Sequence, residues 1–411
     1  MLKLRSISKI DFDNYIKHHK ETSHFMQSSA WGEFEKVTNH VTPHYLGLIN
    51  NEKKIVAATL LLEEHLPMNN CSLYAPRGFI LDYKNKKILY TFVNKLKDFA
   101  KIKKAISIKI NPTIIYKIYK QNKEILISDS EEIISNLKKL GFKRKEQIKL
   151  LEYTYTIDLT KDLIDIENNY SKKIREKILS TAEYDIELTI GTHKDFEELF
   201  SFENPKKNNY YETLYDILSN NEHTKIKLFL GKLHITKTQK KLEKELKRIN
   251  NQISIIPIDN LDKSSKERLA NLKEQKVKIT NEINKFKNYK LEYGNYLTIS
   301  TNLMIEQNNK VWILFETNNH ILEETNLKYT IYNEYIKYYK DKNFHLFIQQ
   351  NPFEQISGFN ELKKEFGGEF TEYIGEYELI TNKFMYLIHT KILSIFNKSR
   401  KDNDNEISNS N

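Results

Sequence analysis

Cysteine and long apolar segments are nearly absent from this chain. Its 411 residues include a single cysteine, Cys71, so no internal disulfide can form, which suits a reducing compartment. The first residues, MLKLRSISKIDFDNY, lack the apolar core of about 7–15 residues that a signal peptide needs. No run approaches the roughly 18 apolar residues of a membrane-spanning helix. We therefore expect a cytoplasmic protein whose contact with a membrane would be peripheral.

The sequence also lacks motifs that identify common enzyme classes. It contains no phosphate-binding loop, no GxGxxG fingerprint and no CxxC pair. The Gly-rich pyrophosphate turn of an acyl-CoA-dependent acetyltransferase is missing, which argues against an ordinary N-acetyltransferase. His40 and His44 are four residues apart, but Pro43 argues against a helix there and no third ligand is evident. We predict neither a metal site nor a cofactor.

Positive charge exceeds negative charge. The chain has 65 Lys and Arg residues against 55 Asp and Glu, a formal net charge of +10. This excess favours an anionic partner such as nucleic acid, an anionic membrane face or a phosphorylated substrate. A lysine-rich composition of the kind that low-GC genomes encode would supply the same charge without any such partner.

Alternating and helical hydrophobic patterns both occur, which predicts an α/β (α+β) protein of two or three domains. Apolar runs at 45–49 and 55–62 predict a hairpin, and residues 85–102 predict an amphipathic helix. A second pair of strands is expected within residues 297–317, followed by a helix at 327–342. This second pair resembles the hairpin at 45–62, so we expect the chain to contain one α/β unit twice.

Residues 235–290 have a different pattern from the rest of the chain. Apolar residues recur at heptad spacing in two stretches that a short break separates. We therefore predict an antiparallel helical hairpin that projects about 30 Å at 1.5 Å per residue. Such an arm would contact another macromolecule or act as a spacer. Its predicted seam comprises Leu242, Leu246, Ile249, Ile253, Leu269, Leu272, Ile279, Ile283 and Phe286.

Two further stretches are candidate binding elements. In SHFMQSSAWGEFEKV (23–37), Ser28 or Ser29 is expected to cap a helix at 30–38, with Trp31 and Phe34 in the core. The second stretch is a basic helix with four cations within six residues. It either faces solvent or binds phosphate oxygens through charge-assisted hydrogen bonds. Its cations are Lys172, Lys173, Arg175 and Lys177.

In order and spacing, several segments resemble the FemABX family of peptidoglycan-bridge aminoacyltransferases. They are HFMQSSAWGEFEKV, LYAPRGFILDY, ISIKINP, YTYTIDL, the basic helix, the predicted arm and LKKEFGGEFTEYIGEYEL. The resemblance covers about residues 20–397. It implies two packed GNAT-like domains with a coiled-coil arm inserted in the second. The implied ranges are 1–150 closed by a helix at 383–397, 151–234 with 291–382, the arm at 235–290 and a disordered tail at 398–411.

The resemblance also implies an activity. A member of this family transfers an amino acid from aminoacyl-tRNA to a peptidoglycan precursor, either lipid II or UDP-MurNAc-pentapeptide. The implied acceptor is the side-chain amine of the stem peptide, or the amine of a residue already added to it. The positive charge suits tRNA phosphates and the precursor's pyrophosphate at an anionic inner membrane face. Two alternatives stay open: a tRNA-dependent aminoacyltransferase with another acceptor, and a non-enzymatic RNA-binding or scaffold protein.

Site residues follow from the resemblance position by position. Lys36 and Arg175 match residues that face the precursor's phosphates, and Tyr210 and Tyr211 match an aromatic pair that lines the cleft. Lys363 matches a lysine near the reacting carbonyl, where it would stabilise the oxyanion. Cations of the arm are expected to bind tRNA: Lys240, Lys241, Lys247 and Arg248.

One position departs from the family pattern. Members often have Asp before the proline of ISIKINP, where this chain has Asn111. An amide does not titrate, so we expect no acid–base role at this position.

Overall fold

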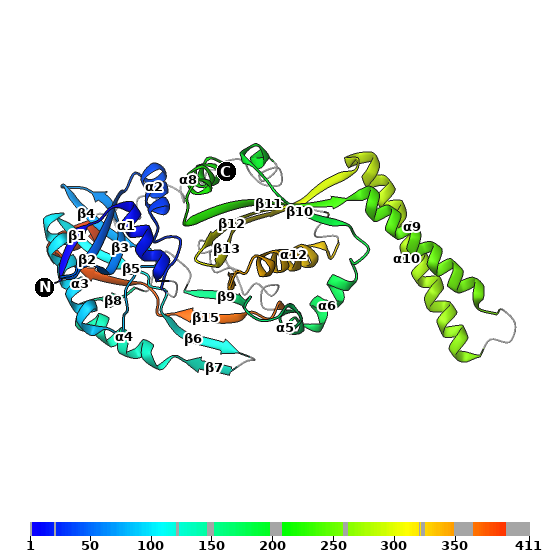
Figure 1. The fold of residues 1–411 in the computed structure, drawn as a ribbon, viewed down its shortest axis with the longest axis horizontal. Coiled ribbons are helices and arrows are strands. Elements are labelled where there is room, and N and C mark those ends of the chain that lie inside the picture. Colours follow the sequence, from blue (N-terminus) through cyan, green and yellow to red (C-terminus); the bar gives the residue numbers. More distant parts are fainter. Residues whose placement is uncertain are drawn as a thin grey trace, which may run out of the picture.

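The computed structural model describes residues 2–19, 22–120, 123–145, 152–197, 208–257, 262–319, 321, 325–348 and 365–391. Within these ranges the chain forms two β-sheets with helices packed beside them, and a pair of long helices leaves the body at one end (Figure 1). The mixed helix and strand content agrees with the predicted α/β (α+β) class.

The first sheet has seven strands in the order β1-β2-β3-β4-β5-β16-β8. Strands β2 and β3 form the predicted antiparallel hairpin, and β4 and β5 run parallel because helix α3 connects them. Helix α3 spans Lys86–Ile102 and buries the apolar face that its spacing predicted. The strands are β1 Lys3–Ser6, β2 Thr42–Ile49, β3 Ile55–Leu66, β4 Asn70–Ala75, β5 Ala105–Ile110, β8 Lys143–Arg144 and β16 Tyr377–Ile380.

The second sheet has nine strands in the order β10-β11-β12-β13-β14-β9-β15-β6-β7. Helix α12, Leu327–Asp341, links β13 to its parallel neighbour β14. The strands are β6 Ile115–Lys120, β7 Lys123–Leu126, β9 Tyr153–Asp158, β10 Ile186–Ile190, β11 Thr224–His234, β12 Tyr296–Gln307, β13 Lys310–Asn318, β14 Leu346–Ile348 and β15 Glu369–Tyr373.

The two sheets share one connectivity. In each, three antiparallel strands are followed by a helix and a parallel strand: β2-β3-β4-α3-β5 in the first and β11-β12-β13-α12-β14 in the second. The hairpin β2–β3 therefore corresponds to β11–β12. The predicted match of β2–β3 with β12–β13 was wrong by one strand, because the helical pair inserted between β11 and β12 separates them in sequence.

Segments distant in the sequence complete both sheets. Strands β6 and β7 lie within residues 1–150, yet they pair at the edge of the nine-stranded sheet. Strand β16, near the C-terminus, returns to the first sheet between β5 and β8. Residues 383–391 are helical, and Tyr386 there donates a hydrogen bond to Glu378 of β16 at 2.7 Å. Residues 392–411, with the predicted tail, lie outside the described residues.

Helices α9, Ile235–Ile255, and α10, Lys263–Tyr293, pack side by side and project from the second sheet (Figure 1). This is the predicted helical hairpin. The predicted seam residues Leu242, Ile249 and Leu272 are buried in it, and Leu246, Ile253, Leu269 and Ile279 are partly buried. Ile283 and Phe286 are buried where the hairpin joins the second sheet.

The remaining helices cover the sheets or connect strands. Helices α1 and α2 pack on the first sheet, and α8 packs against both α2 and β11. Helix α6 packs against α12 on the second sheet. Their bounds are α1 Lys9–His18, α2 Ser29–Asn39, α4 Ser128–Lys139, α5 Leu163–Asn168, α6 Lys172–Leu179 and α8 Asn208–Ser219, with a 3-10 turn, η1, at His193–Asp195.

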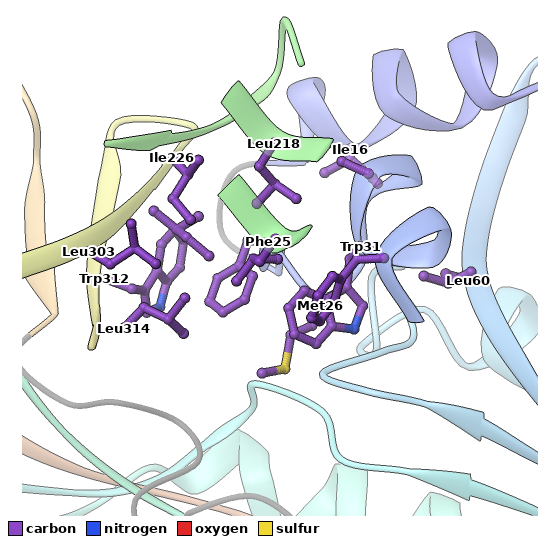
Figure 2. Packing of buried hydrophobic residues seen from close by; sticks show 14 of the residues in the cluster. Ile16, Phe25, Met26, Trp31, Leu60, Leu218, Ile226, Leu303, Trp312 and Leu314 are labelled. Atoms are coloured by element: carbon purple, nitrogen blue, oxygen red, sulfur yellow. The ribbon is translucent and has the colours of Figure 1, made fainter. Parts of the chain in front are cut away.

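One apolar core joins the two halves of the molecule. Phe25 lies between Trp31 of α2 and Trp312 of β13, with ring centroids 5.4 and 5.3 Å away (Figure 2). The same cluster includes Leu60 of the first sheet and Leu303 of the second. Because this core is continuous, the loop that contains Phe25 is fixed at the junction between the sheets.

Candidate functional site

The stretch 23–37 forms a rigid junction between the two sheets. Ser28 caps helix α2, since its hydroxyl accepts a hydrogen bond from the backbone N–H of Trp31 at 3.1 Å. The buried carboxylate of Asp13 on α1 accepts hydrogen bonds from the backbone N–H of Ser29, at 2.9 Å, and from its hydroxyl. Trp31 and Phe34 are buried, as predicted. These contacts hold the loop before α2 in one position.

Gln27 of this loop fixes the turn that contains Arg77. Its Nε2 donates to the carbonyl of Pro76 at 2.8 Å, and its Oε1 accepts from the N–H of Leu60 at 2.9 Å. A Cβ at Gly78 would lie 2.9 Å from the Gln27 side chain, so a larger residue there would push Gln27 out of these hydrogen bonds. The turn APRGF is therefore attached to the junction loop as well as to its own sheet.

Arg77 is buried at this junction, with 4% of its surface exposed. Its Nη1 donates to Oδ1 of Asn111, at the end of β5, across 2.9 Å. Its guanidinium carbon lies 5.4 Å from the ring centroid of Tyr373 on β15. Burial lowers the pKa of Arg77, while Tyr373, Tyr74, Glu152 and Glu376 act in the opposite direction. Arg77 thus places a positive charge between the first sheet and strand β15 of the second.

A small cavity lies beside Arg77. Its volume is about 20 Å³, room for roughly one water molecule. Both sheets contribute to its wall, which combines aromatic rings with a few polar groups. The lining residues are His24, Arg77, Tyr153, Thr154, Trp312, Ile348 and Tyr373.

The two predicted substrate-binding tyrosines lie at the same junction. Tyr210 of α8 meets Phe34 of α2 edge-on at 4.9 Å, and Tyr211 packs on Phe315 of β13 at 4.4 Å. Burial raises the pKa of Tyr210, so its phenol stays protonated at neutral pH. Lys36 is exposed in the last turn of α2, two residues after Phe34. The structure therefore places Lys36 and Tyr210 on two helices in contact.

Arg175 occupies a different part of the molecule. It is exposed on α6, and its Nη1 donates to the carbonyls of Asn168, at 3.1 Å, and Tyr170, at 2.6 Å. Helix α6 lies toward the helical hairpin, whereas α2 lies beside the first sheet (Figure 1). The structure thus does not bring Arg175 next to Lys36, and one nitrogen of its guanidinium already satisfies the carbonyls at the end of α5.

The arm cations differ in their surroundings. Lys240 and Lys247 are exposed on α9. Lys241 lies 3.0 Å from the carboxylate of Asp185, and Nε of Arg248 donates to Glu245 at 2.6 Å. Lys240 and Lys247 are therefore the better placed of the four to contact a partner.

Lys363 lies outside the described residues. Two residues later, Glu365 is placed against the start of α6: its carbonyl accepts from the N–H of Ser171 at 2.8 Å, and its carboxylate lies 3.3 Å from Nζ of Lys173.

Among the residues that the structure describes, no group of three His, Cys, Asp or Glu side chains could hold a metal ion. No helix in those ranges combines the length and apolarity needed to cross a bilayer.

Arg77 was missed as a site residue. In the sequence it is part of a Pro-Arg-Gly turn, and turns are usually exposed. The signals that pointed to it were weak: the Pro-Arg-Gly turn follows one strand, and a polar residue, Asn111, follows the next strand along the chain. Its burial depends on contacts with the other sheet, which local patterns do not report.

The sequence is similar to that of known proteins over nearly its whole length. The family model described as the FemAB family matches residues 7–392. Aminoacyltransferase FemA of Staphylococcus epidermidis is 23% identical over 408 residues, covering 89% of this chain and 93% of that protein. Lipid II:glycine glycyltransferase of Staphylococcus aureus strain bovine RF122 is 22% identical over 425 residues, covering 96% of each.

A solved structure has the same fold. The crystal structure of FemX superposes with a TM-score of 0.74 at 19% sequence identity, covering 94% of this chain and 99% of that one. Family model, relatives and structure all extend over nearly the whole chain.

Proposed function

Because this chain belongs to the FemAB family, we propose that it transfers an amino acid from aminoacyl-tRNA to an amine of a peptidoglycan precursor and so builds the interpeptide bridge. The observation that carries the proposal is the family match over residues 7–392. Relatives of nearly equal length bear the names FemA and lipid II:glycine glycyltransferase, and this agrees with aminoacyl transfer to a cell-wall precursor.

The proposed reaction needs little from the protein besides positioning and charge. The acceptor amine attacks the carbonyl carbon of the aminoacyl ester, and the tetrahedral intermediate expels the ribose oxygen of tRNA. An amide bond forms and an ester bond breaks, and the amine loses one proton while the leaving ribose oxygen gains one. The ester is already activated, so the main tasks are orientation and stabilisation of the oxyanion. We assign the oxyanion role to Lys363.

The acceptor would bind along the junction between the sheets. Lys36, exposed beside the Tyr210–Phe34 contact, suits a phosphate of the precursor, and the half-buried ring of Tyr210 suits its less polar parts. Arg175 would contact phosphate only from the other end of the site. A lipid-linked acceptor would require peripheral contact with the inner membrane face, to which the net charge of +10 is suited.

The arm is the proposed contact for tRNA. It projects from the body, and Lys240 and Lys247 are exposed on it (Figure 1). Lysines bind phosphate oxygens without sequence preference. Such contacts suit an enzyme that recognises the aminoacylated end of a tRNA and holds the rest of the molecule by its backbone.

A transfer assay tests the proposal. The protein is mixed with total tRNA charged with radiolabelled amino acids, together with either lipid II or UDP-MurNAc-pentapeptide. We expect label to move to one acceptor, and the assay then identifies both the amino acid and the acceptor. Binding of tRNA without transfer, while a control enzyme is active, would favour the non-enzymatic RNA-binding alternative.

A further inference from the structure

The junction cavity contains more hydrogen-bonding capacity than the described residues use. Thr154 of β9 lines it and is 5% exposed, and its Oγ1 has no hydrogen-bond partner among the described residues. A buried hydroxyl without a partner is costly, so the hydroxyl of Thr154 is free to bind a further group in the cavity.

Asn111 supplies a donor with a fixed orientation. Its Oδ1 accepts from Nη1 of Arg77, and a guanidinium has only donors, so the oxygen of this amide must face Arg77. The amide nitrogen therefore faces away from Arg77. This Nδ2 is buried and finds no acceptor in the described part of the chain. Arg77 thus fixes the orientation of the Asn111 amide and leaves its nitrogen as the unused hydrogen-bond donor.

His24 supplies a second donor, and its tautomer can be deduced. Its Nδ1 lies 3.2 Å from the backbone N–H of Met26, which can only donate, so Nδ1 must be the acceptor. Burial, together with the charges of Arg77 and Lys310, holds the pKa of His24 well below its usual range. The ring is therefore neutral and has its proton on Nε2. His24, which lines the cavity, therefore has its donor at this nitrogen.

These groups suit a ligand atom that only accepts hydrogen bonds. The charges that reach the cavity leave no large net charge, since the buried carboxylates of Glu152 and Glu376 oppose the cations Arg77 and Lys310, so the site does not call for a charged ligand. A neutral carbonyl oxygen accepts two hydrogen bonds and brings no charge. It also matches a cavity with room for roughly one oxygen-sized group.

We propose that the junction cavity is a subsite for one carbonyl oxygen of a substrate, with Thr154 and His24 of its wall as the donors and with Arg77, held by Asn111, as a further part of that wall. This subsite rests on the proposed aminoacyl transfer, which offers two sources of such an oxygen. One is a peptide carbonyl of the acceptor, and the other is the ester carbonyl of aminoacyl-tRNA.

The test is Thr154→Val, which removes the hydroxyl and keeps the shape. Thr156→Val is the matched control, because Thr156 lies on the same face of β9 but does not line the cavity. We expect Thr154→Val to raise the KM for either the pentapeptide or aminoacyl-tRNA by about fivefold to tenfold, the effect of losing one hydrogen bond. Thr156→Val should leave the KM values for both substrates unchanged. A raised KM for the pentapeptide identifies the acceptor as the source, and a raised KM for aminoacyl-tRNA identifies the donor.

A binding measurement separates failure of the subsite from failure of the proposed function. UDP-MurNAc-pentapeptide and aminoacyl-tRNA are each titrated into both variants and the unmodified protein, with tryptophan fluorescence as the signal because Trp312, one of the two tryptophans, lines the cavity. Weaker binding of one of them to Thr154→Val supports the subsite even if no transfer occurs. Transfer with unchanged KM and Kd values in Thr154→Val would overturn the subsite and leave the function intact. Neither transfer nor binding by the unmodified protein would overturn both.

Discussion

The guanidinium of Arg77 and the side-chain oxygen of Asn111 form a buried hydrogen bond of 2.9 Å at the junction of the two sheets. Both residues come from the first half of the chain, yet Tyr373, close to its other end, packs its ring against the same guanidinium. This contact connects strand β15 of the second sheet to the turn at Pro76–Phe79. The junction is therefore held by polar contacts as well as by the apolar core around Phe25.

Replacing Asn111 is expected to destabilise the fold. Asn111→Ala leaves a buried guanidinium one acceptor short, which should lower the free energy of unfolding by about 1.5–3 kcal/mol. Urea unfolding measures this value. Asn14→Ala, on the exposed face of α1, is the control and should change it by less than about 0.5 kcal/mol. An equally small change in Asn111→Ala would show that the hydrogen bond contributes little.

Glu378 should make stability depend on pH on the acid side. Burial alone would raise the pKa of this carboxyl, but hydrogen bonds from Tyr386, Ser107 and Lys145 hold it below its usual value of 4.5. Its stabilising effect is therefore complete above that value and is lost as pH falls through the lower folded-state pKa. Glu378→Gln should cost roughly 1–2 kcal/mol at pH 7, with allowance for the partly exposed Lys145.

The difference between Glu378→Gln and the unmodified protein should shrink when urea unfolding is repeated at about pH 4 and below. Lys145 does not disturb this comparison, since its pKa is raised by the same partner and it titrates only at alkaline pH. A difference that stays constant from pH 7 to the acid limit would mean that Glu378 has no depressed pKa.

Lys363 should be needed for turnover. If it stabilises the oxyanion, Lys363→Ala should lower kcat by about 10²–10³-fold with little change in either KM. Lys364→Ala is the matched control, as the next residue of the same type. Steady-state transfer rates of the two variants and the unmodified protein measure this effect. Near-normal turnover of Lys363→Ala would show that Lys363 does not stabilise the oxyanion.

Exposed lysines of the arm should matter for tRNA. The double variant Lys240→Glu/Lys247→Glu is expected to raise the KM for aminoacyl-tRNA and to flatten its dependence on salt, because two phosphate contacts are lost. The KM for the precursor should not change. The double variant Lys87→Glu/Lys101→Glu changes the net charge by the same amount and is the control, because both lysines are exposed on α3 away from the arm. A similar KM for tRNA in the two variants would argue that the arm is a spacer.

Local patterns predicted much of the secondary structure. The cap at Ser28, the buried Trp31 and Phe34 and the helical hairpin all depend on contacts between near neighbours, which periodicity and capping residues report directly. The correspondence of the two repeats was offset by one strand because an insertion of two helices hides the pairing of β11 with β12.

Long-range contacts account for what the sequence did not reveal. Strand β16 pairs with β5, and β9 with β14, although each pair is separated by more than 180 residues. Arg77 is buried only because Tyr373 and the loop containing Gln27 cover its turn. Neither pairing nor burial of this kind leaves a periodic pattern, so the junction cavity could not be predicted.

The most direct test of the account is the mass of the product. UDP-MurNAc-pentapeptide or lipid II is incubated with the protein and charged tRNA, in parallel with the same acceptor whose side-chain amine has been acetylated. The account predicts that the free acceptor gains the mass of one aminoacyl residue in an RNase-sensitive reaction and that the acetylated acceptor gains none. No gain on either free acceptor, while a control transferase is active, would contradict it.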